Sequence, residues 1–164
     1  MKHRSRTFTA ISVLALAAGF GLAQGPSLKQ GAGMQHASGT FDVKLTTPPG
    51  VEEGARLGRM TIDKQFHGEL EGTSAGEMLT ATTGINGSAA YVAFERVSAS
   101  LQGRRGSFIL QHSGTVTRGA QQLSVTVVPD SGTDQLAGLT GRMSIKIEGA
   151  EHSYEFAYTL PVAR

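Results

Sequence analysis

Three ionisable side chains, Lys64, Glu95 and His112, each share the phase of apolar residues in an alternating segment. The apolar residues in these phases are Ile62, Phe66, Ala93, Val97, Leu110 and Val116. Because alternate residues of a strand point to the same face, regular strands would direct all three groups into the interior. A Lys, a Glu and a His that meet there would compensate one another's charge, as polar clusters at ligand sites do.

Glu77 is a fourth candidate, and its direction stays undecided. It shares the phase of Thr73, Ala75 and Leu79, whereas Met78 occupies the opposite phase. Two other interpretations of the polar cluster also stay open. Its members could form a satisfied interior ion pair, or β-bulges could turn them outward.

Formal motifs add no catalytic or metal site. Gly72–Gly76 matches G-x-S-x-G, but a nucleophile elbow needs a strand, a sharp turn and a helix in a larger α/β sheet, so we expect a glycine-rich strand or turn. The chain has no Cys, and its five His residues show no H-x-H or H-E-x-x-H spacing. No phosphate-binding G-x-x-x-x-G-K-[ST] occurs. The sequence therefore predicts neither a metal nor a cofactor.

The elements that would position these residues are eight short runs of alternating apolar residues. Glycine, proline, asparagine and aspartate separate them, and no segment beyond the N-terminus has the pattern of an amphipathic helix. The runs are marked by Phe41–Leu45, Met60–Leu70, Thr73–Thr82, Tyr91–Leu101, Phe108–Val116, Leu123–Val127, Met143–Ile147 and Tyr154–Leu160. They predict an all-β, eight-stranded antiparallel barrel of calycin-like, up-and-down form, filled by side chains or holding one small ligand. A two-sheet sandwich is the alternative.

The N-terminal residues 1–23 have the pattern of a secretory signal. Lys2, Arg4 and Arg6 precede an uncharged apolar stretch, Phe8–Ala23, which is shorter than the roughly 20 residues that span a bilayer. We expect cleavage after Ala23, a flexible leader at 24–37, a β-barrel domain at 38–164, and a secreted or periplasmic protein. A retained membrane anchor is the alternative.

The basic character of the whole chain belongs largely to this segment. The formal net charge is +2, from 15 Lys and Arg against 13 Asp and Glu. Without Lys2, Arg4 and Arg6, 12 basic residues remain against 13 acidic ones. Because no long basic stripe is left, nucleic acid is not an expected partner, and no stable membrane span is expected after cleavage.

Several stretches together resemble the bacterial domain-of-unknown-function family 3224. The stretches that carry the resemblance are Met60–Met78, Tyr91–Val97, Gly106–Thr115 and Ser131–Gly141. The resemblance covers about residues 38–161 and implies a small β-barrel similar to those of allene oxide cyclase and dirigent proteins. It implies no catalytic residue, because the family has no established activity.

Three functions are compatible with these observations. The first is binding of a small apolar or amphipathic molecule in the barrel, oriented by Lys64, Glu95, His112 and Glu77. The second is a structural barrel with a filled core that acts as a homo-oligomer or through its surface. The third is a cofactor-independent isomerase or cyclase, in which Glu95 or His112 moves a proton and Lys64 stabilises negative charge. We favour binding and lean against an enzyme.

Overall fold

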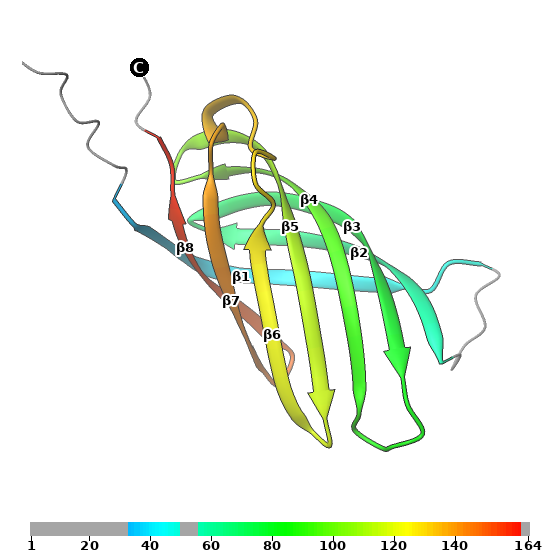
Figure 1. Ribbon diagram of the computed structural model, residues 1–164. Helices are drawn as coiled ribbons and strands as arrows, with labels where there is room; N and C mark the ends of the chain where they lie inside the picture. The colour runs from blue at the N-terminus through cyan, green and yellow to red at the C-terminus, as the bar shows by residue number, and fades with distance from the viewer. Residues whose placement is uncertain (1–32, 50–55, 162–164) are drawn as a thin grey trace, which may run out of the picture. The chain divides into compact units, whose positions relative to one another are not determined.

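A computed structural model describes residues 33–49 and 56–161, which form one closed, eight-stranded antiparallel β-barrel (Figure 1). The strands are β1 (Gln35–Thr46), β2 (Leu57–Gly68), β3 (Leu70–Thr82), β4 (Ala89–Leu101), β5 (Arg104–Thr117), β6 (Ala120–Val127), β7 (Thr140–Glu148) and β8 (Glu151–Thr159). The helical element in these residues is one 3₁₀ turn, η1 (Asp134–Leu136), and no helix there is long and apolar enough to span a bilayer. The predicted signal segment and residues 24–32 of the predicted leader lie outside the described residues.

Each strand pairs with the next one along the chain, and β8 pairs with β1 to close the barrel. The closing ladder runs from Gln35 opposite Tyr158 to Thr40 opposite Ser153. The pairing of β6 with β7 is much shorter and consists of Val125 opposite Met143 and Thr126 opposite Arg142. The prediction of a barrel is confirmed, and the alternative of a two-sheet sandwich is wrong.

Apolar side chains fill one end of the barrel. Phe108 stacks on Phe156 with ring centroids 5.9 Å apart, and Phe156 stacks on Tyr158 at 5.3 Å. The connection between β6 and β7 contributes Leu136 and Leu139, both fully buried, to the same core. This end therefore has a packed interior, which supplies most of the apolar burial that stabilises the fold.

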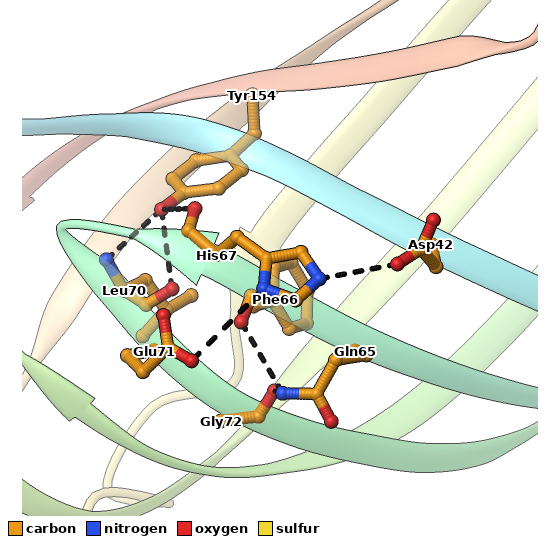
Figure 2. A network of polar contacts seen from close by, with 8 residues as sticks. All are labelled: Asp42, Gln65, Phe66, His67, Leu70, Glu71, Gly72 and Tyr154. Atoms are coloured by element: carbon orange, nitrogen blue, oxygen red, sulfur yellow. Dashed lines mark hydrogen bonds and ion pairs between the residues drawn. The ribbon is translucent and has the colours of Figure 1, made fainter.

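A tyrosine ties β8 to the hairpin between β2 and β3 at this end (Figure 2). The Tyr154 hydroxyl accepts a hydrogen bond from the backbone N–H of Leu70 at 2.9 Å and lies 3.2 Å from the carbonyl oxygen of His67. Gly68 makes the turn with a φ of 103°, in the left-handed region that favours glycine. The hydroxyl thus satisfies a buried N–H that the tight turn leaves without a ladder partner.

Two boundaries differ from the sequence prediction. β1 begins at Gln35, so residues 35–37 belong to the barrel and not to a leader that ends at 37. Ala37 is buried and pairs with Phe156, but the polar residues before it give no apolar alternation. Leu70 opens β3 and does not extend the second run, because the turn at Gly68 reverses the chain before it.

Candidate functional site

The other end of the barrel is hollow. A cavity of about 510 Å³ lies among residues near the β1–β2, β3–β4, β5–β6 and β7–β8 connections, at the end opposite η1. Apolar residues form most of its wall: Phe41, Val43, Leu45, Met60, Ile62, Met78, Ala81, Ala89, Ala90, Val116, Leu123, Ile145 and Ile147. Thr80, Thr82 and Tyr91 add polar atoms. One half of the barrel interior is therefore a packed core, and the other half is an open cavity.

A buried polar cluster forms the floor between the two halves. Glu95 accepts hydrogen bonds from Lys64 Nζ at 2.9 Å and from Ser74 Oγ at 3.1 Å, and its Oε1 lies 3.1 Å from His112 Nε2. All four side chains are buried, and Glu95 is only 1% exposed. The cluster thus satisfies its central carboxylate fully in the protein interior.

Strand register brings these residues together from β2, β3, β4 and β5. Lys64 pairs with Ser74, and His112 lies opposite Ala93, two residues before Glu95 on the same face. Gly76 lies opposite Glu95, and a Cβ atom there would collide with the backbone and side chain of Glu95. Because Gly76 has no side chain, it leaves the space that Glu95 occupies. The cluster therefore requires a glycine at position 76 as well as its polar residues.

The electrostatic balance favours an ionised Glu95. Burial by itself would raise the pKa of the Glu95 carboxyl, but the hydrogen bond from His112 and the nearby charge of Lys64 outweigh it and lower that pKa. The Lys64 ammonium also lies 4.8 Å from the ring centroid of Phe41 and 5.7 Å from that of Phe66, where the ring faces stabilise a cation. Lys64 and Glu95 therefore form a hydrogen-bonded ion pair whose ammonium also makes cation–π contacts with Phe41 and Phe66.

The groups that face the cavity are basic. Lys64, His112 and His152 all line it, whereas Glu95 lies behind them and no Asp or Glu of the described part of the chain belongs to the lining. His152 also packs on Phe41, with ring centroids 5.2 Å apart. The floor can therefore donate hydrogen bonds to a polar group, and His112, held by Glu95, can exchange a proton with it.

Three of the four predicted site residues meet, and the fourth does not. Lys64, Glu95 and His112 converge, which removes the alternative that bulges turn them outward. Glu77 lies on the outer face of β3, where it is exposed and bonds to Arg59. Met78 points inward, so the residues of β3 that share its phase face the interior and those that share the phase of Glu77 face solvent.

Sequence reasoning missed Ser74 and His152. Ser74 lies in the G-x-S-x-G match, which is part of strand β3 and not a nucleophile elbow. His152 shares the phase of Tyr154 and Phe156, so alternation could have found it, whereas Ser74 shares the phase of Met78, which the sequence left undecided. In the described ranges, no group of three or more His, Asp or Glu side chains is arranged to hold a metal ion.

The fold and site define a class: a small antiparallel β-barrel with one packed end, one hollow end and a buried polar floor between them. Within that class, the chain belongs to the DUF3224 family, described as protein of unknown function, whose model matches residues 37–158. A solved structure of a DUF3224 protein of unknown function from Shewanella oneidensis MR-1 is similar, with 48% identity and a TM-score of 0.73. The match covers 80% of this chain and 100% of that one. A comparison with curated proteins gives no match.

Proposed function

We propose that this protein binds a small, largely apolar molecule in the hollow half of its barrel. The observation that carries the proposal is the cavity of about 510 Å³, whose wall is apolar and whose floor presents a few convergent polar groups. Ligand pockets in proteins have this size and this division between apolar walls and a small number of polar anchors.

The structural alternative accounts for only half of the interior. A filled core and a direct Lys64–Glu95 ion pair are what a purely structural barrel would have, and both are present. The hollow half is not expected of such a barrel, because protein interiors pack closely and voids reduce stability. Binding explains why a cavity is retained beside a well-packed core.

One observation favours a second candidate, a cofactor-independent isomerase or cyclase. His112 lines the cavity and is held by Glu95 at 3.1 Å, the arrangement of a base whose partner orients it. The two functions differ in what happens to the ligand. A molecule that co-purifies unchanged, and whose affinity alone falls in a Glu95→Gln variant, supports binding. Conversion of that molecule by the wild-type protein supports catalysis.

We also propose that the protein is exported. The support is the sequence of residues 1–23, with its basic start and apolar stretch. Intact-mass measurement of the protein recovered from the periplasm or medium tests this, and cleavage after Ala23 is expected. Recovery of the uncleaved chain from the membrane fraction would contradict export with cleavage and support the anchor.

The binding proposal is tested with two matched variants on β3. Thr80→Trp places a large ring in the cavity that Thr80 lines, whereas Thr73→Trp places the same ring on the exposed outer face. We expect wild type and Thr73→Trp to bind Nile red and decanol equally in fluorescence and calorimetric titrations, and Thr80→Trp to lose at least about tenfold in affinity.

Circular dichroism and thermal unfolding confirm that both variants are folded. Equal affinity of the two folded variants, or no binding of either probe to the wild type, would contradict the proposal. Native mass spectrometry of the freshly purified wild type adds an independent measurement, because it reports both a retained molecule and the number of subunits.

A further inference from the structure

We propose that the ligand is an amphipathic carboxylic acid, held with its carboxylate at the cavity floor and its apolar chain toward the mouth. This inference rests on the proposed binding function and adds the chemical class and the orientation of the ligand. Its evidence is the positive charge of Lys64 at the floor, the free hydrogen-bonding capacity of Lys64 and His112, and the mainly apolar wall above them.

The charge of the lining selects the head group. Three basic side chains, Lys64, His112 and His152, contribute to the cavity wall, and no acidic side chain among the residues 33–49 and 56–161 does. An ammonium head would meet the like charge of Lys64 at the floor. A carboxylate would meet the Lys64 ammonium, which keeps N–H donors free. Glu95, the acid nearest to that ammonium among the described residues, lies behind the floor and is already committed to Lys64, Ser74 and His112.

The floor has bonding capacity beyond its internal network. An ammonium has three N–H donors, and Lys64 directs one of them to Glu95. His112 donates Nε2–H to the Glu95 carboxylate, so its Nδ1, which has no hydrogen-bond partner among the described residues, accepts a hydrogen bond in the neutral ring and donates one only in the protonated ring. Every fully buried side-chain nitrogen or oxygen atom in those residues has a hydrogen-bond partner. Because Nδ1 has none, it is not fully buried. The cavity that His112 lines is its route to a ligand.

The walls above this floor are mainly apolar, with Thr80, Thr82 and Tyr91 as the polar exceptions. Val43, Met60, Ile62 and Ile145 lie between the polar cluster and the mouth, and all of them line the cavity. At the rim, the side chains of Leu45 and Ile147 are exposed, by 47% and 59% of their residue surface. A chain bound with its head at the floor would cover these rim residues, whereas the opposite orientation would place the carboxylate in solvent at the rim and an apolar chain end against the free N–H donors of Lys64.

The first test compares three probes of equal chain length on the wild-type protein by calorimetry: decanoate, decanol and decylammonium. We expect decanoate to bind at least about tenfold more tightly than decylammonium, with decanol between them. Adding a methylene to the carboxylate should tighten binding about fourfold while the chain stays inside the cavity, the factor that corresponds to ~0.8 kcal/mol per buried methylene.

The outcomes separate the two proposals. If none of the three probes binds, the binding function itself is wrong. If all three bind but decanoate has no advantage over decylammonium, the cavity binds ligands and the carboxylate inference alone is wrong. The Lys64→Met/Glu95→Gln double variant removes both charges of the ion pair together, and it should abolish the preference for decanoate over decylammonium.

The orientation is measured by fluorescence. The chain has no Trp, so Leu45→Trp introduces a single indole at the rim. A fatty acid brominated at its chain end should quench this indole strongly, and its isomer brominated beside the carboxylate should quench it weakly. Stronger quenching by the second isomer would show that the head lies at the mouth and would overturn the proposed orientation. Titration with unbrominated decanoate serves as the control for binding itself.

Discussion

Replacing Glu95 with glutamine should destabilise the barrel far more than the same change at an exposed glutamate. Glu95 is 1% exposed and is the only carboxylate that contacts Lys64 in the described part of the chain, so Glu95→Gln leaves a buried ammonium without a counter-ion. Removal of one partner of a buried pair costs about 3–5 kcal/mol. Such a loss lowers the midpoint of thermal unfolding by on the order of 10 °C.

Replacing Lys64 should lower the free energy of unfolding by less than replacing Glu95, because Glu95 has other hydrogen-bond partners in the cluster. In Lys64→Met, Glu95 keeps its hydrogen bonds with Ser74 and His112, so the carboxylate stays partly compensated. In the Lys64→Met/Glu95→Gln double variant, no unpaired charge remains, and most of the lost stability should return. A double-mutant cycle tests this expectation. It compares the free energies of urea unfolding of the wild type, both single variants and the double variant.

The matched control for this cycle is Glu77→Gln on the outer face. Glu77 pairs with Arg59 in solvent, where the two side chains are 60% and 49% exposed, so its loss should change the unfolding free energy by less than about 1 kcal/mol. The reasoning is refuted if Glu95→Gln unfolds with the same free energy as Glu77→Gln. It is also refuted if the double variant loses as much stability as the two single variants added together.

Three further predictions concern the positioning of the site. Gly76→Ala should cost about 1–3 kcal/mol in urea unfolding, because the added methyl collides with the neighbouring strand, whereas Gly84→Ala in open space should be neutral; equal effects would contradict the close approach. Tyr154→Phe should cost about 1–3 kcal/mol, because the buried N–H of Leu70 loses its acceptor, and unchanged stability would show that this bond contributes nothing. Because the pKa of Glu95 is lower in the folded protein than its ordinary value of 4.5, ionised Glu95 should stabilise the fold at pH values above 4.5. This stabilisation should be lost as the pH falls through the lower pKa of the folded state. Acid unfolding of the Glu95→Gln variant should lack this pH-dependent component.

Alternation in the sequence predicted eight antiparallel strands and the inward direction of Lys64, Glu95 and His112, but it left a two-sheet sandwich open beside the barrel that the structure shows. Both predictions rest on the period of two in a strand, which survives in β2, β4 and β5 because few irregularities interrupt them. Glu77 could not be placed in the same way. Small residues occupy both phases of β3, and only the pairing of Gly76 with Glu95 and of Ser74 with Lys64 decides which phase points inward.

The division of the interior into a packed and a hollow half was not predictable from alternation. Residues that line the cavity and residues that fill the core are equally apolar, as Ile62 and Phe66 on the same strand illustrate. The difference depends on how large the side chains are at each level around the whole barrel. At the packed end, large aromatic rings meet and the β6–β7 connection covers them, and this arrangement is set by tertiary contacts between distant segments.

The short ladder between β6 and β7 means that the barrel wall is not equally strong all the way round. Only Val125 and Thr126 pair across this boundary, and the first five residues of β6, 120–124, are exposed. Amide hydrogens there should exchange with solvent by local opening, long before those of the β3–β4 and β4–β5 ladders, which are paired along 13 residues each. Leu123 and Ile145 flank the same boundary and line the cavity, so local opening of this boundary would expose the cavity from the side of the barrel.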